Sequence, residues 1–136
     1  MVGLEKNGPI LFVKPFPKPE ALEIGSCLDQ TEQFVLKKIC PDYSVTCVNR
    51  EGKASKKHTD AVCAELEQFN TIILMGKQCA TLLSLGHEYQ EWGNRPFFIG
   101  GKKHTFWFTP ALGNIMTSNK RLKQFRTFVE NVIENL

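Results

Sequence analysis

Residues 71–76 read TIILMG and give the clearest strand signal in the chain. Five apolar or β-branched residues in a row, ended by a glycine, are too few for a helix and typical of a strand buried on both faces. The residues that follow predict a helix closed at Gly86, the residue type suited to a left-handed cap, with apolar positions Ala80, Leu82, Leu83 and Leu85. A strand followed by a helix is the unit from which parallel sheets are built.

Strand and helix signals also alternate toward the N-terminus. Residues 10–13 (ILFV) form an apolar run bounded by prolines and predict a buried strand, whereas residues 14–19 (KPFPKP) cannot be helical. Asp29 and Glu32 have the spacing of a capping box. They predict a helix that ends before the next proline, filled by Phe34, Val35, Leu36 and Ile39. Residues 44–48 (SVTCV) are β-branched and predict a second strand.

The rest of the chain contains two further helix signals and a hairpin signal. Thr59 can cap a helix over residues 60–69. Residues 97–99 and 105–108 flank the segment GGKK (100–103) and can form the two strands of a hairpin. Ser118 or Asn119 then caps the last helix. Its apolar stripe comprises Leu122, Phe125, Val129, Val132, Ile133 and Leu136, opposite the basic residues Lys120, Arg121, Lys123 and Arg126.

This alternation predicts an α/β fold, a three-layer sandwich with a mostly parallel central sheet between helices. The chain has 136 residues, of which 42% are hydrophobic and 23% charged, so we expect one globular domain over residues 1–136. Ligands of such sheets bind beyond the carboxyl ends of the strands. A net charge of +3 permits nucleic-acid binding without requiring it.

Composition also bears on location and cofactors. Apolar runs are far shorter than the roughly 18 to 20 residues that cross a bilayer, and the N-terminal residues lack a signal-peptide core. The five cysteines are odd in number and contain no CxxC pair, which favours buried, reduced thiols. The three histidines are isolated. We therefore expect a cytoplasmic protein without membrane contact, bound metal or cofactor.

Several motifs occur in an order known from one enzyme family. The segments are ILFVKPFPK, SVTCVN, TIILMGKQCATLLSLG, GNRPFF and FWFTPALGNIM, followed by an amphipathic helix. This series resembles the uracil-DNA glycosylase superfamily. It is most similar to the compact bacterial branch, whose motifs are GExPG, TN, LG, RG and HPS or HPA. The resemblance covers nearly the whole chain from Ile10 and implies the fold of that family.

The resemblance also implies that the catalytic motifs are degenerate. The polar residue that handles the attacking water falls at Pro15, and the histidine that stabilises the departing uracil anion falls at Thr109. The asparagine that reads uracil falls at Cys47, unless Asn49 replaces it. Because glycosidic cleavage needs an oriented water and a stabilised leaving group, we expect ordinary uracil excision to be absent or feeble. Candidates for a remaining base pocket are Phe16, Pro17, Thr46, Cys47 and Asn49.

The same resemblance implies a surface that faces DNA. In the family, the loop after HPS pushes an apolar side chain into the duplex, and here that loop contains Leu112, Asn114, Ile115 and Met116. The apolar members of this loop can equally pack inside the protein. Candidate phosphate contacts are Lys56, Lys57, Lys120 and Arg121, which can equally be ordinary solvated charges.

Three functions therefore remain open. The first is a catalytically inactive protein of glycosylase fold that binds DNA or another protein of DNA replication or repair, or associates with itself. The second is a divergent glycosylase acting on a modified base, with Asn49, Thr109 or Asn114 as replacement polar groups. The third is an assembly domain that binds no nucleic acid.

Overall fold

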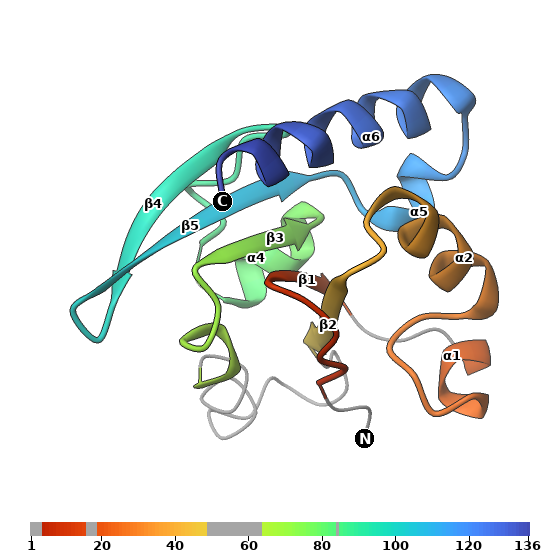
Figure 1. Ribbon diagram of the computed structural model, residues 1–136, viewed down its shortest axis with the longest axis horizontal. Helices are drawn as coiled ribbons and strands as arrows, with labels where there is room; N and C mark the ends of the chain where they lie inside the picture. The colour runs from red at the N-terminus through yellow and green to blue at the C-terminus, as the bar shows by residue number, and fades with distance from the viewer. Residues whose placement is uncertain (1–3, 16–18, 49–63, 84) are drawn as a thin grey trace.

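The computed structural model describes residues 4–15, 19–48, 64–83 and 85–136. Its sheet has five strands in the order β2-β1-β3-β5-β4 (Figure 1). Their bounds are β1 Ile10–Pro15, β2 Tyr43–Val48, β3 Thr71–Met75, β4 Asn94–Ile99 and β5 Lys102–Thr109. Neighbouring strands are parallel except for the antiparallel pair β4 and β5. The predicted α/β fold with a mostly parallel sheet is therefore confirmed.

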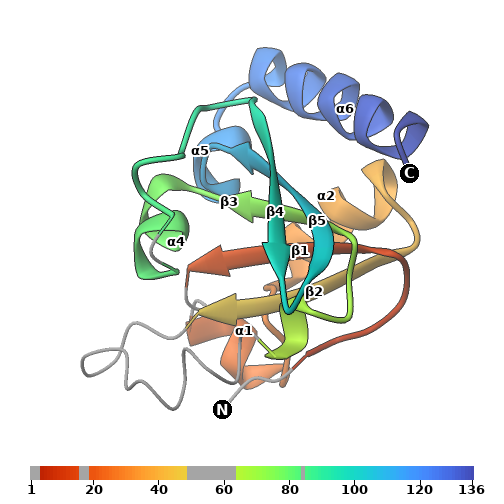
Figure 2. The ribbon, with the colours of Figure 1, turned by 90° about the vertical axis from the view of Figure 1, so that its left-hand side faces the viewer.

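Helices cover both faces of this sheet. They are α1 (Pro19–Glu23), α2 (Gln30–Ile39), α4 (Lys77–Leu82), α5 (Leu112–Ile115) and α6 (Asn119–Glu134). Ile10 and Phe12 of β1 pack with buried residues of α2, α5 and α6, whereas Leu11 and Val13 pack with those of α4 on the opposite face. Figure 2 shows the sheet between α4 and α6. Because β1 and β3 are buried on both faces, they contain the uninterrupted apolar runs seen in the sequence.

Two predicted helix caps are confirmed. The backbone N–H of Glu32 donates to Oδ1 of Asp29 over 2.8 Å, and the Asp29 N–H donates to Oε1 of Glu32 over 3.1 Å. Ser118 caps α6 by accepting the N–H of Arg121. The apolar patterns were less accurate, because Phe34, Ile133 and Leu136 are exposed and the buried Phe128 was missed.

Other boundaries differ from the prediction. Helix α4 ends at Leu82 with Leu83 as its cap, so Gly86 is not a left-handed C-cap. The proline-rich segment was expected to contain no helix, but α1 begins at its last residue, Pro19, because proline fits the first turn of a helix. The hairpin turn is also shorter than expected: Gly100 and Gly101 alone form it, with φ of 58° and 81°, which two glycines adopt without strain.

The predicted helix over residues 60–69 can be compared only in part. Residues 64–66 are helical, while Thr59 and residues 60–63 lie outside the described residues. Phe69 was predicted to be the last residue of this helix; it is buried, but it lies beyond the last helical residue. Within the described ranges, no helix has both the length and the apolar character needed to cross a membrane.

Candidate functional site

The parallel strands β1, β2, β3 and β5 end at one edge of the sheet, called the rim here. Pro15 pairs with Val48 across β1 and β2, and Met75 pairs with Thr109 across β3 and β5. Figure 2 shows β1, β2 and β3 ending together. The rim is the place where open parallel sheets bind ligands. It brings together Lys14, Pro15, Cys47, Gly76 and Thr109.

A buried ion pair occupies the end of β1. The ammonium Nζ of Lys14 lies 3.0 Å from Oε1 and 2.9 Å from Oε2 of Glu32, a residue of α2. Oε1 of Glu32 also accepts the N–H of Asp29. Sequence reasoning missed this pair. The signal was present, since Lys14 follows Ile10 and Phe12 at alternate positions and must point into the same helix-covered face.

Cys47, which the resemblance aligns with the uracil-reading asparagine, is a buried thiol beside a second one. Cys27 donates a hydrogen bond to the Cys47 sulfur, which raises the pKa of Cys27 and lowers the pKa of Cys47. The positive charge of Lys14 adds to the lowering of the Cys47 pKa and opposes the rise in the Cys27 pKa. A thiol cannot reproduce the paired donor and acceptor of an asparagine amide, so this position cannot read a base edge as the family does. Sequence reasoning did not connect Cys27 with this site.

The other cysteines and Thr46 are also engaged inside the protein. Cys40 and Cys79 are buried thiols, whereas Cys63 lies outside the described residues. Thr46 points to the opposite face from Cys47, because side chains alternate along a strand. Its hydroxyl donates to Oε2 of Glu65 over 2.8 Å. A base pocket formed jointly by Thr46 and Cys47 is therefore not supported.

Thr109, at the position of the family histidine, is fully buried. Its hydroxyl donates to the Pro110 carbonyl over 2.9 Å, while its own carbonyl accepts the Gly76 N–H over 2.7 Å and the Tyr89 hydroxyl over 3.1 Å. Gly76 has a φ of 103°, and a Cβ there would lie 3.4 Å from the Cβ of Ala111. Thr109 thus joins the ends of two strands, and its polar groups are used internally.

The loop predicted to enter DNA is a short helix that faces the core. Leu112 and Ile115 are 2% and 0% exposed and belong to the same cluster as Phe125 of α6. Met116 is half-buried and Asn114 is exposed. Two of the three apolar wedge candidates are therefore packing residues, because the i, i+3 spacing places both on the inner side of α5.

The remaining candidates fall into two groups. Lys120 is exposed and Arg121 half-buried, both in the first turn of α6. Pro15 is half-buried at the end of β1. The other sequence-predicted residues lie outside the described ones: Phe16, Pro17, Asn49, Lys56 and Lys57.

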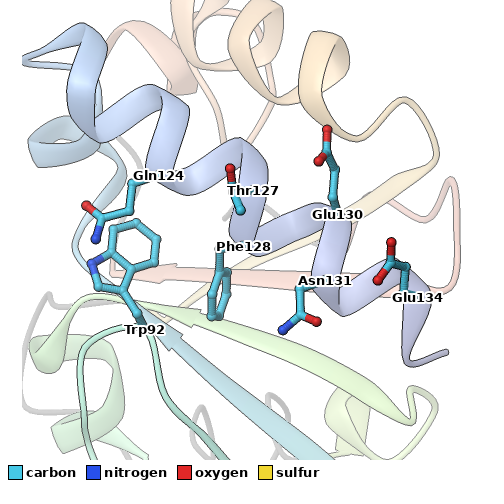
Figure 3. Close-up of a pocket in the computed structure, with 7 residues that line it drawn as sticks. All are labelled: Trp92, Gln124, Thr127, Phe128, Glu130, Asn131 and Glu134. Atoms are coloured by element: carbon cyan, nitrogen blue, oxygen red, sulfur yellow. The ribbon is translucent and has the colours of Figure 1, made fainter.

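A separate hollow of about 610 Å³ lies between α6 and the segment before β4 (Figure 3). Trp92 packs edge-on against Phe128, with ring centroids 5.3 Å apart, and has a left-handed φ of 64°, which is strained for a large side chain. Figure 3 shows Phe128 pointing from α6 toward the sheet beside Trp92. Trp92 is half-buried.

No protein-family model matches the chain, and no curated protein matches it significantly. The structure by itself places a sealed ion pair, a thiol pair and a buried threonine at the rim. Among these groups there is no exposed nucleophile next to a base, which is the arrangement that covalent and acid–base catalysis use. Function must therefore be argued from these contacts.

Proposed function

We propose that this protein is a non-catalytic binding protein built on a glycosylase-like α/β domain. One observation carries the proposal: Thr109, at the position of the leaving-group histidine, is fully buried and has its hydroxyl hydrogen-bonded to Pro110. A neutral hydroxyl committed to the protein interior cannot stabilise a departing base anion. The fold is then a scaffold for binding surfaces rather than for a reaction.

The other rim contacts support the same proposal. Lys14 is neutralised by Glu32 and so offers no free cation to an oxyanion, and Pro15 offers no donor that would orient water. Loss of a single preorganised donor already lowers a rate by about a hundredfold or more. The changes at Pro15, Cys47 and Thr109, all at the same rim, therefore favour the absence of base excision.

The proposal is tested by incubating the protein with duplexes that contain uracil or a panel of modified bases. We expect no base release above the buffer control at a protein concentration equal to that of the DNA, while an active glycosylase releases uracil from the same duplex. Thr109→His is expected to remain inactive and to fold less stably, because a larger ring must enter a filled site. Release of any base above the buffer control would overturn the proposal and favour a divergent glycosylase.

One candidate for the partner that this protein binds is DNA. It is favoured by the exposed charge of Lys120 next to Arg121 in the first turn of α6. Such contacts reach phosphates without reading bases and depend strongly on salt. Because Leu112 and Ile115 are buried, this candidate does not include insertion of either side chain into the duplex.

A further inference from the structure

A groove runs between α2 and α6, on the side of the sheet to which Phe12 points. Its volume is about 500 Å³, within the range of pockets that accept small ligands or side chains. Its apolar lining comprises Phe34, Val35 and Ile39 of α2 and Leu122 of α6. Ile39 and Leu122 rest on the buried core, whereas Phe34 is 69% exposed.

The groove is bordered by positive charge from both helices. Lys38 extends from α2, and Lys123 and Arg126 extend from α6; no aspartate or glutamate is among the described residues that line it. In the described parts of the chain, no carboxylate lies within ion-pair distance of these three cations. An apolar floor is thus combined with unneutralised positive charge at one place, on a protein whose net charge is only +3.

We propose that the groove between α2 and α6 binds an acidic peptide segment of a partner protein. A large apolar side chain of that segment packs on Phe34, Ile39 and Leu122, as in the binding of peptides to hydrophobic grooves. Its neighbouring carboxylates contact Lys38, Lys123 and Arg126, and the guanidinium of Arg126 can hold one of them through two parallel hydrogen bonds. This surface goes beyond the proposed function of the rim and uses none of its residues.

Two other occupants fit the observations less well. In a two-fold contact with a second copy, the cations of one groove would face the same cations of the other, which is repulsive. Single-stranded nucleic acid would match the charge but prefers a row of aromatic side chains for stacking. Here the floor has one exposed phenyl ring, and its other apolar members, Val35, Ile39 and Leu122, are aliphatic.

The test begins with selection of random twelve-residue peptides on the immobilised full chain. We expect the selected peptides to be rich in Asp and Glu around one or two Leu, Phe or Trp residues. Binding of a selected peptide, measured by fluorescence polarisation, should weaken at least tenfold in Phe34→Ser and at least tenfold in Lys123→Glu with Arg126→Glu. Both substitutions affect exposed side chains, so the variants should fold like the parent.

Matched controls use surface residues outside the groove. Phe98 of β4 is 73% exposed, and Lys102 and Lys103 are exposed in β5, so Phe98→Ser and Lys102→Glu with Lys103→Glu should each bind the peptide within twofold of the parent. The proposal is overturned if no peptide is selected or if binding survives Phe34→Ser.

Two competing occupants give distinct results. Displacement of the peptide by oligothymidylate with tighter affinity would replace the proposal by nucleic-acid binding, and a dimer in sedimentation that dissociates in Phe34→Ser would replace it by self-association. The base-release assay involves none of the groove residues, so either proposal can fail alone.

Discussion

Lys14 and Glu32 form an ion pair in which the ammonium nitrogen lies 3.0 and 2.9 Å from the two carboxylate oxygens, with only 6% and 2% of the side chains exposed. Lys14 stands near the end of β1, and Glu32 belongs to the capping box at the start of α2. The pair therefore connects the rim of the sheet to the helix that covers it. Charges removed from water this completely require each other, since neither has solvent to replace its partner.

Removal of one member of this pair should be strongly destabilising. We expect Lys14→Met to lower the free energy of unfolding by about 3 to 5 kcal/mol, because it leaves the Glu32 carboxylate buried without its counter-charge. Urea denaturation measures the change. The exposed Lys38→Met serves as control and should change stability by no more than about 0.5 kcal/mol.

A double variant isolates the interaction itself. Lys14→Met combined with Glu32→Gln removes both charges while the glutamine can still accept the N–H of Asp29. Its stability should be well above that expected from adding the two single changes. Additive losses, or an unaffected Lys14→Met protein, would be incompatible with a buried pair.

Leu112 should behave as a core residue rather than as a DNA wedge. It is 2% exposed, so Leu112→Ala should lower the free energy of unfolding by about 2 to 5 kcal/mol through lost burial and a residual cavity. Met116→Ala, at a half-buried position on the same loop, should cost clearly less. Thermal unfolding checks both. A fully stable Leu112→Ala protein with specifically weakened duplex binding would restore the wedge hypothesis.

If the protein binds DNA through the start of α6, the binding should be electrostatic. Lys120→Glu with Arg121→Glu should weaken binding to all sequences alike and reduce the slope of log affinity against log salt by up to about two. Folding should not suffer, because negative side chains complement the N-terminal end of a helix dipole. Titration of a labelled duplex at several salt concentrations measures both effects. If the folded double variant binds the duplex as tightly as the parent, the start of α6 is not the DNA-binding surface.

Cys40 should contribute to a loss of stability in alkali. Burial and, to a smaller extent, the charge of Asp42 raise the pKa of the Cys40 thiol from 9.0 to about 11. The folded state therefore favours the protonated thiol, and its contribution is complete below pH 9 and is lost as the pH rises toward 11. Urea unfolding at pH 7, 9 and 10.5 should show a smaller decline for Cys40→Ala than for the parent. Parallel declines would exclude a shifted Cys40.

Sequence patterns were sufficient to predict the features that depend on residues close together in the chain. The runs ILFV and TIILM are too short and too apolar to be anything but strands covered on both faces. The capping box was predictable because Asp29 and Glu32 meet within a single helical turn. The mostly parallel sheet followed from the alternation of these elements, since parallel neighbours need a crossover between them.

Whether a side chain at the candidate sites is buried or exposed depended on contacts between distant parts of the chain. Glu32 is 18 residues from Lys14, and no local pattern reveals that they share one enclosed space. Three adjacent apolar residues in α2 left its buried side undefined, and packing against the sheet selected Leu36 and left Phe34 in solvent. The four-residue helix α5 is too short for a periodicity. Only its position against α6 decided that Leu112 and Ile115 face the core, because burial is a property of the assembled layers.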